Sequence, residues 1–266
     1  MVLRQLTKLA LDTFPDTSLT LIARFPSLFN FRLGLIIMCF SASASFTASA
    51  VLTATGALSV RRAAQLKGGI GLLSLSTFPV FFGIQQGFEG LVWLGMSETI
   101  STSLRDVAAL GFMFFAFLFW PIASPVTGYL IETQPVRKKI FLFLIPTGIA
   151  VGAYLTYFTL INFKAPIAPT HWGSHLSYLI DARLIDHSEY VYFFTACAPL
   201  VFSSNRIAFR FGCALAASFA ITMIGFQLTT LPSIWCFFAS ICSLIIVIEL
   251  YQTKTKETKI KEVRYN

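Results

Sequence analysis

The stretch GIQQGFEGLVW, residues 83–93, places one acid and two amides inside a long apolar run. Gln85 and Glu89 are four residues apart and therefore share one face of a helix, and Gln86 is three residues from Glu89. Trp93 continues this face by one further turn. Polar side chains in an otherwise apolar helix face the interior of a bundle rather than lipid. The stretch therefore predicts an interior membrane helix that presents a carboxyl and two amides to a pocket or to hydrogen bonds between helices.

The composition of the whole chain also indicates a membrane protein. Of its 266 residues, 56% are hydrophobic and 12% are charged, whereas soluble domains have about 25% charged residues. Apolar runs of roughly the length that crosses a bilayer follow one another along the chain. We therefore predict an all-α fold, a bundle of seven transmembrane helices. The runs cover approximately residues 39–60, 72–96, 107–131, 140–162, 188–204, 207–228 and 231–251.

Basic residues are distributed unevenly over the links between these runs. Thirteen Lys and Arg residues lie in the C-terminal tail and in, or within a few residues of, the links after the first, third and fifth runs, and three lie in the other links. Lys and Arg concentrate on the cytoplasmic side of membrane proteins. We therefore predict that the N-terminus of the bundle is outside and that the C-terminus is inside. The net charge of +8 then reflects orientation and contact with anionic lipid headgroups, and no nucleic-acid partner is expected.

The two ends of the chain differ from the region of the seven runs. Arg24 and Arg32 interrupt the apolar residues of segment 1–37. We predict a poorly ordered or interfacial extension there, with an eighth span and a signal peptide as the alternatives. Residues 38–251 form the predicted seven-helix membrane domain, and residues 252–266 form a basic cytoplasmic tail.

The predicted orientation places several polar side chains at one level of the bundle. Glu89 lies six residues before the end of its run, which is about 9 Å below the outer surface at the helical rise of 1.5 Å per residue. The start of the first run, the end of the sixth and the start of the seventh reach the same level. We therefore predict a polar pocket in the outer half of the bundle. Its predicted residues are Gln85, Gln86, Glu89, Trp93, Ser41, Gln227 and Trp235, with Ser233 and Cys236 at the same level.

The link 163–187 contains all three histidines of the chain. His171 and His175 are four residues apart, a spacing at which two imidazoles on one helical turn can hold a metal ion. His187 and Asp181 are candidates for a further ligand. The alternative is that these are ordinary solvated or helix-capping side chains. The sequence requires no cofactor, and a transition metal such as zinc at these four residues is the one cofactor that it suggests.

Several spaced motifs accompany the quoted helix. They are MCFSASASF at 38–46, WP at 120–121, SSNR at 203–206 with FG at 211–212, and SIWCFFAS at 233–240. Together they resemble an uncharacterised family of bacterial multi-pass membrane proteins, whose members start at Met-Cys-Phe-Ser-Ala and carry a QQxxEGxxW helix. The resemblance covers roughly residues 38–251. It implies a family start at Met38 and a location in the bacterial cytoplasmic (inner) membrane, and it implies no activity.

Three functions are consistent with these residues. The leading hypothesis is a non-enzymatic one, in which Gln85, Gln86 and Glu89 bind, sense or move a small polar solute or ion. The first alternative is a metal-dependent membrane hydrolase acting on lipid or envelope substrates, with Glu89 as a ligand or base. A fainter similarity to seven-helix hydrolases of the alkaline ceramidase type implies this alternative, although the histidines here lie in a link. The second alternative is a structural or assembly role. The oligomeric state is left open.

Overall fold

The computed structural model describes residues 41–164, 166, 176–178, 188–225 and 230–252. In this part of the chain the regular secondary structure is helical, which confirms the predicted all-α class. Seven helical segments are present, and each overlaps one of the predicted apolar runs. They are α4 (Ala42–Gln65), α5 (Gly69–Ser76) with α6 (Phe78–Met96), α7 (Thr102–Met113) with the π-helix η1 (Phe114–Phe119) and α8 (Trp120–Ile131), α9 (Pro135–Ile161), α10 (Ser188–Val201), α11 (Arg206–Gly225), and α12 (Leu231–Cys242) with its extension to Gln252.

Five of these segments are long and apolar enough to cross a membrane. The two others are the α5–α6 segment and α10. The polar residues of α6 lower its hydropathy, and α10 has 14 residues, whereas a perpendicular span needs about 20. The five are Ala42–Gln65, Thr102–Ile131, Pro135–Ile161, Arg206–Ile224 and Leu231–Gln252.

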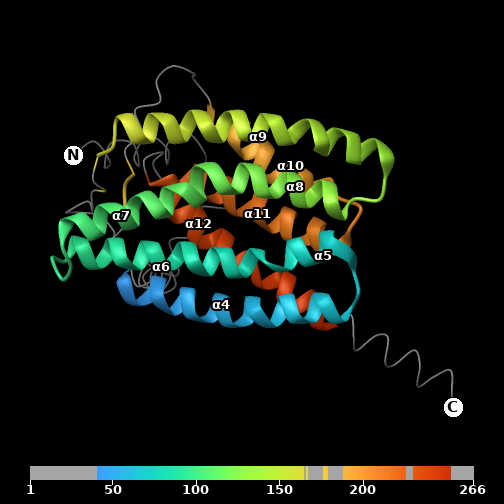
Figure 1. Cartoon of the computed structure of the whole chain (residues 1–266), viewed down its shortest axis with the longest axis horizontal. Coiled ribbons are helices and arrows are strands. Elements are labelled where there is room, and N and C mark those ends of the chain that lie inside the picture. The colour runs from blue at the N-terminus through green and yellow to red at the C-terminus, as the bar shows by residue number, and fades with distance from the viewer. Residues whose placement is uncertain (1–40, 165, 167–175, 179–187, 226–229, 253–266) are drawn as a thin grey trace, which may run out of the picture. The chain divides into compact units, whose positions relative to one another are not determined.

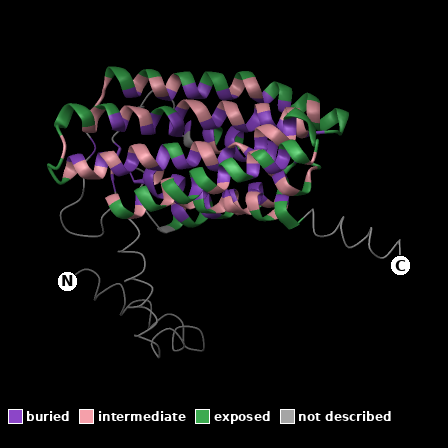
Figure 2. Ribbon diagram, turned by 60° about the horizontal axis from the view of Figure 1, so that its bottom comes forward, coloured by how far each residue is buried: buried purple, intermediate pink, exposed green. Residues whose placement is uncertain are grey.

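The helices lie side by side along one common direction, which is horizontal in Figure 1. We call the two ends of the bundle the Met96 end and the Gln65 end, after the residues at which α6 and α4 finish. α6 packs against α4, α7 and α12, while α8 packs against α5, α9 and α10. Buried residues gather between the helices and exposed ones lie on the outer faces (Figure 2). An interior cavity is lined by side chains of α6, α8, α10, α11 and α12.

α4 lies on a glycine face of α6. A Cβ atom at Gly83 would be 2.5 Å from Thr53 Oγ1 and 3.0 Å from the backbone oxygen of Ser49. A Cβ atom at Gly90 would be 2.8 Å from the ring of Phe46. The missing side chains allow the two helices to approach closely, as small residues do in membrane bundles. This contact occupies one face of α6 and leaves its polar face to the other helices.

The π-helix η1 ends at Phe119 and is followed by Trp120 and Pro121, the first two residues of α8. The Trp120 N–H donates to the backbone oxygen of Phe115, five residues earlier, which is the π-helical register. In this register the oxygen of Ala116 would need an N–H at position 121, and proline has none. The hydroxyl of Tyr192 on α10 donates to the Ala116 oxygen instead. A neighbouring helix thus supplies the bond that Pro121 removes, as backbone groups at membrane depth require.

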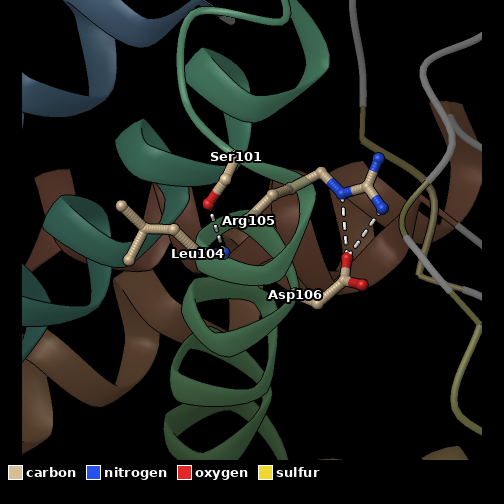
Figure 3. Close-up of polar contacts among 4 residues, drawn as sticks. All are labelled: Ser101, Leu104, Arg105 and Asp106. Carbon is tan, nitrogen blue, oxygen red and sulfur yellow. Dashed lines mark hydrogen bonds and ion pairs between the residues drawn. The ribbon is translucent and has the colours of Figure 1, made fainter.

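The turn between α6 and α7 is closely packed. Ser101 Oγ accepts a hydrogen bond of 3.3 Å from the backbone N–H of Leu104, which caps the start of α7. Arg105 Nε donates to Asp106 Oδ1 at 2.8 Å (Figure 3). A side chain at Gly95 would overlap the stem of Arg105. The basic residue of this link is therefore packed on α6 and paired with an acid.

Glu132 connects two links at the Gln65 end. Its Oε1 accepts from the backbone N–H groups of Thr133 and Gln134, both at 2.8 Å, and its Oε2 accepts from the N–H of Ser204 at 2.8 Å. The Ser204 hydroxyl also donates to Oε1. Burial by itself would raise the pKa of Glu132, but these hydrogen bonds, that of the Ser204 hydroxyl first, lower the pKa below its ordinary value of 4.5.

A Glu132→Gln variant should therefore be less stable than the wild type at neutral pH. Because the folded-state pKa of Glu132 lies below the unfolded-state value, the ionised carboxylate stabilises the fold above about pH 4.5. This contribution disappears as the pH falls through the lower, folded-state pKa. We expect a loss of about 1 kcal/mol at pH 7, since solvent near the links screens the charge.

Thermal melts in detergent between pH 3 and pH 7 measure this effect. Glu98→Gln is the matched control, because Glu98 is an exposed acid in the α6–α7 turn. The difference in melting temperature between wild type and Glu132→Gln should shrink on acidification. A constant difference over this range would contradict the role assigned to the carboxylate.

Candidate functional site

The polar residues of α6 are buried in the centre of the bundle. Gln85 and Gln86 are 0% exposed and Glu89 is 1% exposed. Their burial follows from the helical spacing, since α4 covers the glycine face and the polar face turns toward α8 and α12. Buried polar atoms cost free energy unless they are hydrogen-bonded. The partners of these three side chains therefore determine what the site can do.

Two of the partners come from other helices. Trp120 Nε1 on α8 donates to Gln85 Oε1 at 2.8 Å, and the Ser233 hydroxyl on α12 donates to Glu89 Oε1. The indole of Trp120 is itself stacked on the ring of Phe82, with centroids 3.9 Å apart. An indole N–H can only donate. The amide oxygen of Gln85 must therefore face Trp120, and its NH₂ group points away from that bond.

Six buried polar atoms around this point have no hydrogen-bond partner. They are Gln85 Nε2, both side-chain polar atoms of Gln86, Glu89 Oε2, Trp93 Nε1 and the hydroxyl oxygen of Tyr178. Nearly all buried polar groups in native proteins are hydrogen-bonded to protein or to ordered water. Among the described residues, no Lys or Arg forms an ion pair with Glu89. The carboxyl group therefore has one oxygen bound by Ser233 and one oxygen without a partner.

The link after α9 also contributes to the site. Tyr178 is 2% exposed, and its ring stacks on Phe112 of α7 at a centroid distance of 4.8 Å. Its hydroxyl and the thiol of Cys236 are close enough to Glu89 to interact with it electrostatically. The side chain of Gln86 lies beside the same carboxyl. We call these residues the Glu89 group: Gln85, Gln86, Glu89, Trp120, Tyr178, Ser233 and Cys236.

A cavity lies next to the Glu89 group. It offers about 20 Å³ to the centre of a water molecule, which is room for one or two waters. Trp120 and Cys236 line the cavity and also belong to the Glu89 group. The rest of the lining is largely aromatic, including Phe82, Tyr192 and Trp235. The cavity is therefore largely apolar, and it meets the Glu89 group at Trp120 and Cys236.

The other predicted pocket residues have separate places. Ser41 is the N-cap of α4, where its hydroxyl accepts from the N–H of Ala44 at 3.2 Å. Trp235 is buried, lines the cavity and donates through Nε1 to the backbone oxygen of Leu215 at 3.3 Å. Trp93 lies one turn beyond Glu89 with its buried Nε1 unpartnered. Gln227 is outside the described residues.

The predicted metal ligands are all outside the part of the chain that the structure describes. These are His171, His175, His187 and Asp181. Within the described ranges, no group of three or more His, Cys, Asp or Glu side chains is arranged to hold a metal ion. The zinc site therefore stays a prediction.

Two members of the Glu89 group were missed by the sequence reasoning. Trp120 belongs to the WP motif, and its signal is chemical: a buried indole N–H inside an apolar helix needs an acceptor, and an amide at the same depth is a natural one. Tyr178 lies in a link, where no helical spacing places it. Ser233 and Cys236 were assigned to the level of Glu89, and the structure brings both to it.

Comparison with known proteins gives one match. Residues 38–261 match the model of a family of unknown function, DUF6629. The match covers most of the chain, and the chain therefore belongs to this family. Membership of an uncharacterised family, as predicted from the motifs, is confirmed. No curated protein and no solved structure matches the chain.

Proposed function

We propose that this member of the DUF6629 family is an integral membrane protein that binds, senses or transports a small polar solute or ion at the Glu89 group. The observation that supports this function is the set of buried polar atoms without partners around one carboxyl. A native interior satisfies such atoms, and the described protein groups do not satisfy these. A small bound species between them would supply the missing hydrogen bonds or charge.

A purely structural role for the Glu89 group fits these atoms less well. A polar network that only fixes the packing of helices should have its members bonded to one another, because a partly satisfied network is less favourable than an apolar core. Here Gln86 lies beside the Glu89 carboxyl, yet neither of its side-chain polar atoms reaches a protein partner with hydrogen-bond geometry. We therefore favour a ligand over a packing network.

The proposal includes the membrane topology. All seven helical segments cross the bilayer, with the Met96 end outside and the Gln65 end in the cytoplasm, in a bacterial cytoplasmic membrane. The basic residues support this orientation. Arg61, Lys67, Arg137, Arg206 and Arg210 lie at the Gln65 end or in its links. In this topology the Glu89 group lies in the outer half of the bundle.

A ligand screen by thermal stability tests this function. The purified full-length chain in detergent is melted with a panel of salts, zinc and small uncharged polar solutes. At least one member should raise the melting temperature of the wild type, because a ligand at one hundred times its Kd stabilises the folded state by about 2.7 kcal/mol. The same member should have no effect on Glu89→Gln, which keeps the shape of the side chain and removes its charge.

Glu98→Gln is the control, since it makes the same chemical change at an exposed acid. It should respond to the ligand as the wild type does. If no member of the panel stabilises the wild type, or if Glu89→Gln responds equally, the proposed function is wrong.

A further inference from the structure

We propose that the ligand of the Glu89 group is a single monovalent cation of alkali-metal or ammonium size, held by side-chain oxygen atoms. This inference rests on the function proposed above and names the chemical class of its ligand. It follows from three properties of the site, which are its charge, the identity of its free oxygens and its size.

The charge of the site favours one positive charge. Glu89 is buried, and the described part of the chain offers it no cationic partner. An ionised carboxylate in an apolar interior is costly unless a cation pairs with it. A monovalent cation leaves the Glu89 group neutral. A divalent cation would leave it with a net positive charge, and an uncharged solute would not compensate the charge of an ionised carboxylate.

The free atoms of the site include a set of hard oxygen ligands. Glu89 Oε2, Gln86 Oε1 and the Tyr178 hydroxyl are all buried and unpartnered. The Ser233 oxygen lies against the same carboxyl and keeps its lone pairs, because it acts as the donor to Glu89. Carboxylate, amide and hydroxyl oxygens are the ligands that hard cations prefer. With one carboxylate, one thiol and no imidazole among its members, the Glu89 group fits a hard cation better than a transition metal.

The site also restricts the size of the ligand. The adjacent cavity has room for one or two water molecules. Free space of this size next to the site favours a small cation over organic cations with substituents. Phe82, Trp120 and Trp235 line this cavity, and an apolar surrounding strengthens the attraction between an ion and a carboxylate.

Gln85 has a positioning role in this arrangement. Its amide oxygen is occupied by the indole N–H of Trp120 at 2.8 Å, so that this oxygen is not free to bind a cation. Its NH₂ group lies near the thiol of Cys236. Gln85 therefore connects the polar face of α6 to α8 and α12, while Gln86 and Glu89 supply the oxygens.

Cation replacement at constant ionic strength tests the inference. The full-length wild type is melted in N-methyl-D-glucamine chloride, which is replaced stepwise by LiCl, NaCl, KCl or NH₄Cl, and separately by CaCl₂. At least one small monovalent cation should raise the melting temperature. Above its Kd, each tenfold increase in cation concentration should add an equal increment. Calcium and N-methyl-D-glucamine should not. This wild-type measurement does not depend on the folding of any variant.

Two pairs of variants locate the effect. The cation response should disappear in Glu89→Gln and persist in Glu98→Gln. Gln86→Met should require at least about tenfold more cation than Gln134→Met for the same rise in melting temperature, which corresponds to about 1.4 kcal/mol. Gln134→Met is the control, because Gln134 has the same side chain at an exposed position.

The outcomes separate this inference from the proposed function. If uncharged solutes stabilise the wild type through Glu89 and no monovalent cation does, the function stands and the inference is wrong. Stronger stabilisation by calcium or zinc than by any monovalent cation also overturns the inference. If neither cations nor uncharged solutes stabilise the wild type, both proposals are wrong.

Discussion

The Gly148→Ala substitution should severely destabilise the bundle. A Cβ atom at position 148 on α9 would overlap the backbone oxygen of Pro121 on α8. A backbone oxygen cannot rotate away as a side chain can, so α8 and α9 would have to separate along their contact. Overpacking of this kind costs about 3 kcal/mol or more. The displacement would also reach Trp120, which precedes Pro121 and holds Gln85.

Gly152→Ala is the matched control for this substitution. It lies one turn further along α9, where a Cβ atom would be 3.1 Å from the Phe117 oxygen and 3.2 Å from the Leu118 side chain. Small adjustments relieve contacts of that length, and alanine favours the helix by about 1 kcal/mol. Thermal melts in detergent should show a large loss for Gly148→Ala and little change for Gly152→Ala. Equal melting temperatures would mean that α8 and α9 do not pack as described.

Trp120→Phe should have the second largest effect, on stability and on ligand binding together. Phenylalanine keeps an aromatic ring against Phe82 but removes the N–H that donates to Gln85 Oε1 at 2.8 Å. An amide oxygen left without a donor in the interior costs about 1–3 kcal/mol. The freed amide of Gln85 can also rotate, so that the polar face of α6 loses its fixed orientation. We expect a lower melting temperature and at least about a tenfold weaker ligand response, or about 1.4 kcal/mol.

Trp235→Phe provides the comparison. The N–H of Trp235 donates to the backbone oxygen of Leu215 at 3.3 Å, and this oxygen also accepts from the Ser218 hydroxyl at 2.8 Å. Loss of the indole N–H there leaves the acceptor with a partner. If Trp235→Phe lowers the melting temperature as much as Trp120→Phe does, the bond to Gln85 has no special weight.

Local spacing in the sequence predicted the faces of α6 correctly. Gln85 and Glu89 share the buried polar face, as 3.6 residues per turn predicts. Gly83 and Gly90, which contact α4, lie on a different face of the helix. Ser233 lies near the start of the last apolar run, which predicted that it would be at the same depth in the membrane as Glu89. Its hydrogen bond to Glu89 agrees with that prediction.

Contacts that depend on the rotation of one helix against another were not predictable in this way. Periodicity alone does not show that Trp120 faces Gln85, because the π-helix before it changes the rotation of α8 relative to α7. Tyr178 reaches the site through a link whose path no periodic pattern determines. The sequence therefore predicts which residues of one helix act together, while the fold decides which partners meet them.

An experimental structure of the full-length chain in lipid nanodiscs, determined in the cation that stabilises it, tests the central claim most directly. Density for a bound species should lie between Glu89 Oε2, Gln86 Oε1 and the Tyr178 hydroxyl, within bonding distance of each. If these atoms instead bond directly to one another or to other protein groups, with no density between them, the Glu89 group is a packing network and the proposed ligand site does not exist.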